Sequence, residues 1–187
     1  VAHAIGVTAD ETEFDFYTAM DDVKRDMDGT DAGGAMLGTI EYTSSTLYRY
    51  AAVDFDSLIR NLDGDPDTAI DTVLAFIQAF TTAIPTGRQH SFAAHTLPYG
   101  VRIILRDSQP FSLVGAFSTP IRGENVEQKA WDKMGVHEQA LEAAFDVQPE
   151  ASWNVTVGGD TSLSQVLDCL RDTLGLVADR DTAGRVL

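Results

Sequence analysis

The spacing of apolar and polar residues along the chain predicts a mixed α+β domain. Residues 1–8 are small and β-branched and predict a strand. From Met36 to Val53 apolar positions alternate with polar ones, which indicates a long strand or a bent pair. The intervening residues 10–34 are acidic and end in DMDGTDAGG, a run typical of turns and loops. Two strands around a long loop predict an excursion that projects from a sheet.

Four later segments carry the apolar spacing of helices. The start of the second is the clearest, because Asp65 is a favourable N-cap and Pro66 suits the first turn. Its apolar stripe continues to Ile84, and Pro85 is expected to end it. The predicted helices are Asp54–Leu62, residues 66–84, Glu124–Phe145 and Ser162–Leu174.

Short apolar runs bounded by turn signals predict three more strands, at Ser91–His95, Gly100–Leu105 and Phe111–Phe117. Residues Asp179–Leu187 are expected to fray. The order of strand, excursion, strand, helix, strands and helices favours a mostly antiparallel sheet with helices on one face.

Length and composition favour a soluble protein of ordinary domain size. The 187 residues are 44% hydrophobic, enough to bury a core, and no apolar stretch approaches the roughly 18 residues of a membrane span. No signal peptide is visible at Val1. The single cysteine, Cys169, excludes an internal disulfide and is placed by its spacing on the core face of a helix. We expect a cytoplasmic protein.

The formal charge argues against a nucleic-acid partner. Thirteen Lys and Arg against 29 Asp and Glu give −16 at pH 7, whereas binding to phosphates gains affinity from basic surface. A nucleic-acid partner would require one of two explanations: the basic residues lie mostly in a part of the protein absent from this sequence, or a few cations are focused on one face. The rival hypothesis is an acidic protein–protein interaction module without nucleic-acid binding.

The polar residues do not form a recognisable catalytic or metal-binding pattern. The four histidines and the cysteine lack the spacing of zinc ligands. Asp26, Asp28 and Asp31 lack the correctly placed glycine and distal glutamate of a calcium loop. The adjacent Asp21 and Asp22 have no base or nucleophile to act with. We therefore predict no metal, no cofactor and no enzymatic activity.

Two short segments are candidates for binding. Phe16, Tyr17 and Thr18 lie in the acidic excursion, where adjacent aromatics either anchor the loop or stack against bases. In the second segment, Thr86 to His90, the side chain at Arg88 either interacts with the end of the preceding helix or binds phosphate.

Three stretches together resemble one family. They are VAHAIGVT with the following DFYTAMDDV, then GTIEYTSSTLYRYAAVDFDSL at residues 38–58, and PTGRQHSFAAHTLPYGVRIILR at residues 85–106. In this order, over residues 1–122, they resemble CasC, the backbone subunit of the type I-E CRISPR interference complex Cascade. About the first half of the family pattern, with its first palm strand and a basic motif, has no counterpart, so we expect a fragment or processed piece.

The resemblance implies a fold. It is the second half of a ferredoxin-like, RNA-recognition-motif-like (RRM-like) palm over residues 1–122, with an inserted β-hairpin thumb at about residues 9–37. Residues 123–187 are expected to form a helical region that packs on the palm.

The resemblance also implies a function. The family is non-catalytic, binds CRISPR RNA, polymerises along it and presents it for pairing with target DNA, together with other copies of itself and the other Cascade subunits. It implies RNA contacts for seven residues: Phe16, Tyr17, Thr18, Arg49, Arg88, Gln89 and His90. Arg49 is the weakest of them, because an arginine between two tyrosines is also typical of a structural ion-pair partner.

Overall fold

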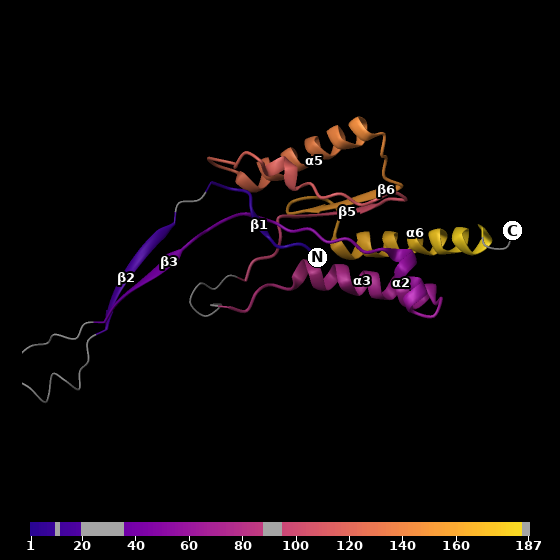
Figure 1. The fold of residues 1–187 in the computed structure, drawn as a ribbon, viewed down its shortest axis with the longest axis horizontal. Helices are drawn as coiled ribbons and strands as arrows, with labels where there is room; N and C mark the ends of the chain where they lie inside the picture. The colour runs from indigo at the N-terminus through magenta and orange to yellow at the C-terminus, as the bar shows by residue number, and fades with distance from the viewer. Residues whose placement is uncertain (10–11, 20–35, 88–94, 185–187) are drawn as a thin grey trace, which may run out of the picture.

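The fold was obtained as a computed structural model, which describes residues 1–9, 12–19, 36–87 and 95–184 (Figure 1). It is a mixed α/β structure in which the strands pair as three two-stranded antiparallel sheets, β1–β4, β2–β3 and β5–β6. The strands are β1 (Ile5–Gly6), β2 (Glu13–Ala19), β3 (Met36–Tyr42), β4 (Leu47–Tyr48), β5 (Gly100–Leu105) and β6 (Ala151–Thr156). The helices are α2 (Phe55–Asn61), α3 (Pro66–Thr82), the 3₁₀-helix η1 (Val114–Phe117), α5 (Val126–Phe145) and α6 (Leu163–Gly184).

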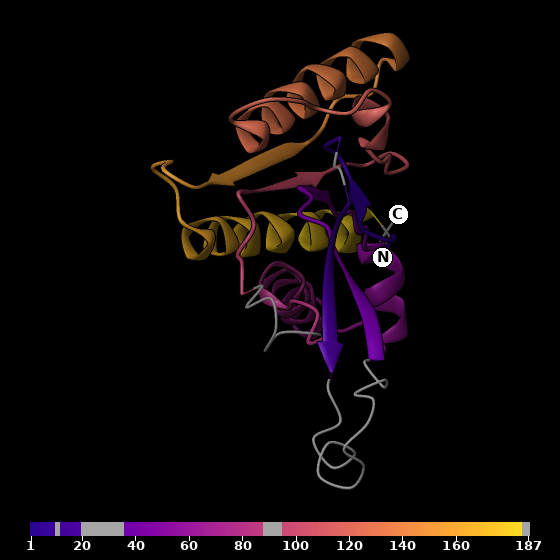
Figure 2. The same ribbon diagram turned by 90° about the vertical axis from the view of Figure 1, so that its left-hand side faces the viewer.

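Helices cover both faces of the β5–β6 sheet, with α5 on one side and α3 and α6 on the other (Figures 1 and 2). Successive side chains of a strand point to opposite faces. Ile103 and Leu105 accordingly pack against the core between α3 and α6, while Arg102 reaches Glu138 on α5. The expectation of helices on one face is therefore wrong, because β5 carries an apolar side and a charged side and each has its own helical cover.

Two apolar clusters hold the body together. The larger one joins α3 to α6 through buried residues Ile70, Val73, Leu74, Leu170 and Leu174. The smaller one joins the chain next to β1 to α5 and consists of Val7, Ile121 and Ala130, with Tyr48, Phe117 and Val126 packed against it. Only the first half of the predicted apolar stripe of α3, which contains Ile70 and Val73, is buried.

Helix α3 begins where the sequence predicts, with Asp65 as its N-cap. The Asp65 side chain accepts hydrogen bonds from the amides of Asp67 at 3.0 Å and Thr68 at 3.1 Å, and Pro66 occupies the first turn. The bond from the Thr68 hydroxyl, the largest cause, lowers the pKa of the Asp65 carboxyl. The helix ends at Thr82, three residues before Pro85, because a proline disfavours helical backbone in the residue before it.

Strand β5 and the four helices were predicted, but Phe111–Phe117 is not a strand. Val114–Phe117 forms η1. The amide of Leu113 donates to the Tyr48 hydroxyl at 2.9 Å, so a side chain satisfies a backbone group that a strand would pair in a ladder. Most of the predicted strand at residues 91–95 lies outside the described residues.

The C-terminal part also differs from the prediction. Strand β6, which pairs with β5 from Gly100↔Thr156 to Leu105↔Ala151, was not expected. Helix α6 continues through residues 179–184, which were predicted to fray, since its buried stripe extends to Ala178. Cys169 is exposed rather than on the core face, because that face is formed by Val166, Leu170 and Leu174. None of the described helices has the length and hydropathy that a membrane crossing requires.

A buried ion cluster fixes α5 to β5. Glu138 is 1% exposed, and its carboxylate lies 2.5 Å from Arg102 Nε and 3.3 Å from an Arg106 nitrogen. Arg106 also contacts Glu142 at 2.5 Å, and its guanidinium lies 4.3 Å from the Phe111 ring centroid. Burial raises the pKa of the Glu138 carboxyl, and the Arg102 charge opposes this effect.

Removing the central carboxylate is expected to destabilise the fold. Glu138→Ala leaves Arg102 without its acidic partner inside the protein, which we expect to lower the free energy of unfolding by about 3 kcal/mol in urea denaturation. Glu127→Ala removes an exposed carboxylate from the same helix and should change the value by no more than about 0.5 kcal/mol. Equal effects of the two substitutions would show that the cluster does not hold α5 in place.

The exposure of Cys169 is directly measurable. We expect its thiol to react with Ellman's reagent in the folded protein at a rate within about tenfold of the rate in denaturant. The matched control is a Cys169→Ser/Leu170→Cys double variant, which moves the thiol by one position to a site that is 3% exposed. That thiol should react more slowly, because it is reached only through opening of the helix.

Candidate functional site

The excursion predicted from the sequence is a β-hairpin that projects from the body (Figures 1 and 2). Its strands β2 and β3 pair in continuous register from Glu13↔Tyr42 to Ala19↔Met36. A two-stranded ribbon is only marginally stable by itself and usually gains stability by packing a face against something else. The hairpin is therefore the first place to look for a binding surface.

Aromatic side chains are exposed on both faces of the hairpin. Phe14 is 55% exposed and Phe16 72%, and they share one face because they are two residues apart in a strand. Tyr17, 49% exposed, lies on the other face. Phe16 thus does not anchor the hairpin to the body, which was one of the two interpretations of this segment. Phe14 was not among the predicted contacts, although its spacing of two residues from Phe16 was the available signal.

Tyr17 is held in place within the hairpin. It is paired directly with Gly38 on β3, and its ring lies over that glycine so closely that a Cβ there would overlap the ring. An aromatic ring that covers a glycine on the neighbouring strand stabilises the pair. Thr18 follows in β2, and its side chain lies outside the described part of the chain.

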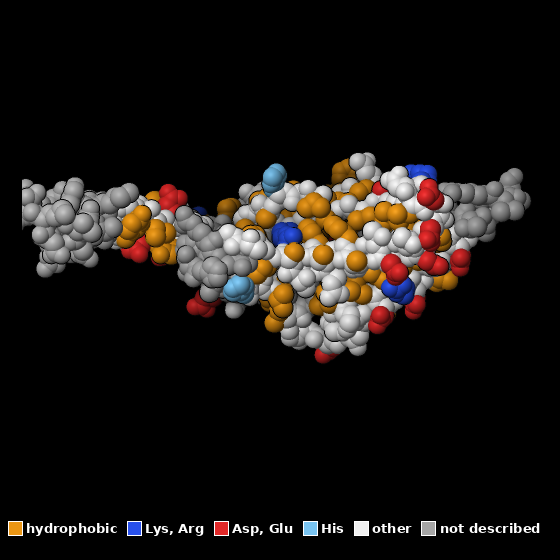
Figure 3. Space-filling model, turned by 90° about the horizontal axis from the view of Figure 1, so that it is seen from below, with side chains coloured by type: hydrophobic (Ala, Val, Ile, Leu, Met, Phe, Trp, Pro, Cys, Tyr) orange, Lys and Arg blue, Asp and Glu red, His pale blue; other side chains and the backbone are white. Residues whose placement is uncertain are grey.

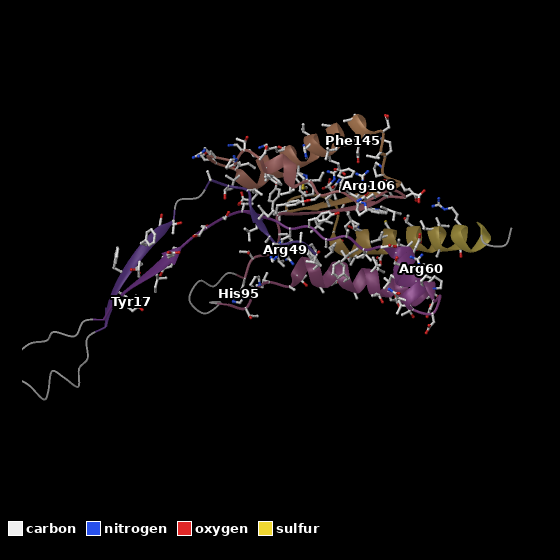
Figure 4. All side chains as sticks on the ribbon, viewed as in Figure 1. Tyr17, Arg49, Arg60, His95, Arg106 and Phe145 are labelled. Atoms are coloured by element: carbon white, nitrogen blue, oxygen red, sulfur yellow. The ribbon has the colours of Figure 1, made fainter. Side chains whose placement is uncertain are left out.

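Arg49 lies on the body, apart from the hairpin (Figure 4). Its guanidinium donates to the carbonyl of Ala83 at 3.3 Å and lies 4.3 Å from the ring centroid of Phe80. These contacts place a cation at the C-terminal end of α3, where the helix dipole is negative. Arg49 therefore has two structural partners at the end of α3, the Phe80 ring and the Ala83 carbonyl.

The other three predicted contacts, Arg88, Gln89 and His90, lie outside the described residues. They follow Pro85 in the chain, soon after the carbonyl that Arg49 binds. The structure therefore places Phe16 and Tyr17 together on the hairpin and Arg49 at the end of α3. It does not bring these two groups together.

The described arginines are largely engaged in ion pairs. Four of them contact carboxylates: Arg102, Arg106, Arg171 and Arg180. On the face seen from below, apolar side chains form a broad area over the middle of the body, and acidic ones collect toward the end that carries the C-terminus (Figure 3). Across the described residues, no group of three or more His, Cys, Asp or Glu side chains is arranged to hold a metal ion.

The contact between Tyr17 and Gly38 gives a spectroscopic prediction. The ring current of Tyr17 should shift the Gly38 α-proton resonances upfield, and Tyr17→Ala should return them to ordinary glycine values. Phe16→Ala is the matched control, because it removes the neighbouring ring from the opposite face and should leave those resonances in place. Similar spectra for the two variants would contradict the described hairpin.

The fold of this chain is similar to that of known proteins. The chain is similar to a solved structure titled "CRISPR RNA-guided surveillance complex", with a TM-score of 0.77 and 29% identity over 94% of this chain and 69% of that one. It is also similar to one titled "CRISPR RNA-guided surveillance complex, pre-nicking", with a TM-score of 0.74 and 29% identity over 92% of this chain and 49% of that one. No curated protein matches the chain.

The second comparison shows that the chain spans about half the length of one of its structural relatives. A family match covers nearly all of the sequence, from residue 1 to residue 174, and the family is described as CT1975-like protein. The chain belongs to the CT1975-like protein family.

Proposed function

We propose that this chain is part of the CRISPR RNA-binding backbone subunit of a type I-E surveillance complex, the subunit called CasC. In this function the subunit polymerises along the guide RNA and presents it for pairing with target DNA. The observation that carries the proposal is the similarity to CRISPR RNA-guided surveillance complexes, at a TM-score of 0.77 over 94% of the chain. The proposed partners are the guide RNA, target DNA through that RNA, other copies of the subunit and the other subunits of the complex.

In the proposed function the hairpin is the thumb of an RRM-like palm. Phe16 stacks against a base or wedges between two bases, since every base offers a π-face to an aromatic ring. Its 72% exposure leaves the ring accessible for such a contact. Tyr17, held against Gly38, stiffens the hairpin and presents its exposed edge, and Thr18 is the polar neighbour.

The loop after α3 supplies the contacts to the RNA backbone. Arg88, Gln89 and His90 bind phosphate and 2′-hydroxyl groups, which carry little sequence information. Arg49 supports this loop from the end of α3. Sequence specificity then comes from base pairing between guide and target, so the subunit needs to position the RNA and not to read its bases.

The proposed organisation has the palm and thumb in residues 1–122 and a C-terminal region in residues 123–187. We assign no catalytic residue, because the role is to hold and expose a guide strand. The acidic surface is compatible with this role. A net charge of −16 limits non-specific binding to nucleic acids, and the few cations near the RNA then decide where it binds.

The hairpin contact is tested by RNA binding under a salt titration. The probe is a fluorescein-labelled RNA derived from a CRISPR repeat, and the readout is fluorescence anisotropy. Phe16→Ala should weaken binding by about 5-fold to 150-fold, since a stacked base contributes roughly 1–3 kcal/mol. Phe145→Ala is the matched control, because Phe145 is 70% exposed at the end of α5, far from the hairpin (Figure 4).

The loop contact is tested in the same assay. Arg88→Ala/His90→Ala should weaken binding and lower the slope of log affinity against log salt by about 1 for each lost phosphate contact. Arg60→Ala/His3→Ala removes the same residue types from exposed positions outside this loop and should leave the slope unchanged.

Two outcomes would overturn the proposal in different ways. If all variants bind the RNA as the parent does, the assigned residues are wrong. If the parent does not bind the RNA even at low salt, the alternative becomes the better hypothesis: an acidic protein–protein interaction module, which the charge of −16 favours.

A further inference from the structure

Three cations gather where α5 begins. Arg122 and Lys129 are exposed, and Lys133 is half-buried one helical turn further along. Among the described residues, no carboxylate forms an ion pair with any of the three, whereas four other arginines are paired in this way. In a chain with a net charge of −16, a group of cations without acidic partners is the exception. We call Arg122, Lys129 and Lys133 the basic ridge.

Backbone carbonyls hold both lysine ammoniums of the ridge. Lys129 Nζ donates to the carbonyl of Arg122 at 3.2 Å, and Lys133 Nζ donates to the carbonyl of Thr119 at 2.8 Å. An ammonium has three donors, so each lysine keeps two for another ligand. The two side chains lie one turn apart, about 6 Å along the helix axis. The carbonyls thus fix two positive charges in a row and leave them able to bind anions.

The carboxylates nearest to the ridge in sequence do not neutralise it. Asp132 accepts a hydrogen bond from the side chain of Gln128 at 2.8 Å. Glu127 precedes Lys129 by two positions, so the two side chains do not face each other on the helix. Glu124, in the loop before α5, forms no ion pair with a described residue. The ridge is therefore available to an external anion.

The ridge lies beside the root of the hairpin. The Ile121 amide donates to the Val7 carbonyl at 2.9 Å, and the Ala9 amide donates to the Ile121 carbonyl at 3.1 Å. Because Arg122 follows Ile121, these bonds fix the start of the ridge to the chain that leads into β2. Helix α5 begins at the end of the body from which the hairpin projects (Figure 1). A strand that reaches the hairpin therefore has the ridge close to its path.

We propose that the basic ridge is a further contact to the sugar–phosphate backbone of the bound nucleic acid, next to the hairpin. The inference rests on the proposed function, in which the hairpin contacts bases, and it adds a phosphate site that the sequence did not indicate. Lysines bind phosphate as point charges, and contacts to phosphate carry no sequence information. A nucleic-acid strand has a phosphate at every nucleotide, so Lys129 and Lys133 contact different phosphates.

An acidic protein surface offers the same charge as a nucleic acid, but the two partners differ in what else they need. Single-strand binding sites combine cations along the backbone with aromatic side chains on which bases stack. The hairpin supplies exposed rings at Phe14 and Phe16, and the ridge is bonded to its root. This combination favours a nucleic-acid strand over an acidic protein.

The test removes the two lysine charges and keeps donors for the loop carbonyls. Lys129→Gln/Lys133→Gln replaces each ammonium by an amide, which still donates hydrogen bonds. The probe is the fluorescein-labelled repeat RNA, bound to the full chain under a salt titration. We expect binding to weaken by roughly 2-fold to 30-fold. The slope of log affinity against log salt should fall by about 2, one for each lost phosphate contact.

Three control variants make the assay specific. Lys129→Arg/Lys133→Arg keeps both charges and should keep the slope of the parent, since arginine also binds phosphate. Arg171→Gln/Arg180→Gln removes two charges from exposed positions of α6 and should leave the slope unchanged. Asp132→Asn removes a carboxylate beside the ridge and should strengthen binding. Circular dichroism of each variant shows whether it is folded.

A second probe identifies the strand that the ridge holds. It is the same RNA paired with a complementary DNA. Equal losses of slope with the two probes assign the ridge to the RNA strand. A loss that occurs only with the paired probe assigns it to the DNA strand.

Three results would overturn the inference. The first is binding that Phe16→Ala weakens and the glutamine variant does not, in which case the proposed function stands and only the ridge is misassigned. The second is an equal loss in the glutamine and arginine variants, which indicates that the lysines only hold the loop. The third is no binding of either probe by the parent, which overturns the proposed function as well. Self-association that the glutamine variant loses would then assign the ridge to an acidic protein surface.

Discussion

The position of α5 depends on the buried contact of Arg102 and Arg106 with Glu138. Burying charges is expensive, and the cost is offset only when each charge has its partner in good geometry. Here the two arginines are four residues apart in the chain and point to the same side, and the carboxylate comes from the middle of a helix. An apolar contact would allow α5 to slide over β5, whereas the paired charges favour one register. Because the same helix packs against the chain next to β1, this register also sets where the β1–β4 pair lies relative to β5.

The hairpin obeys a different constraint. It is held by the β2–β3 ladder and by the ring of Tyr17 over Gly38, and it projects from the body. Exposed aromatic rings on such a ribbon cost solubility and contribute little to its stability, so their presence is best explained by a partner. Among the described aromatic side chains, Phe16 has the largest exposed fraction. Tyr17 is held in place by its contact with Gly38. In the proposed function Phe16 is the ring that stacks on a base, and Tyr17 stiffens the hairpin from the opposite face.

The sequence predicted local features better than contacts between distant segments. The helical spacing and the cap at Asp65 depend on neighbouring residues and were correct. Strand β6 was missed because its pairing partner lies about fifty residues away, and Phe111–Phe117 was misassigned because the Tyr48 hydroxyl, remote in sequence, binds the Leu113 amide. At the site, alternation in a strand requires at least one of two adjacent aromatics to face away from the body, and Phe16 does so. It did not predict that Gly38 would hold Tyr17 or that Arg49 would lie over Phe80, since both depend on which strands and helices become neighbours.

The end of α3 is held by Arg49. Its guanidinium lies over the Phe80 ring and donates to the carbonyl of Ala83, which precedes Arg88 and His90 in the chain. In the proposed function these two residues contact the RNA, so Arg49 fixes the point of the chain from which they continue. With a net charge of −16, the chain has few cations to attract RNA, and in that function their placement matters more than their number.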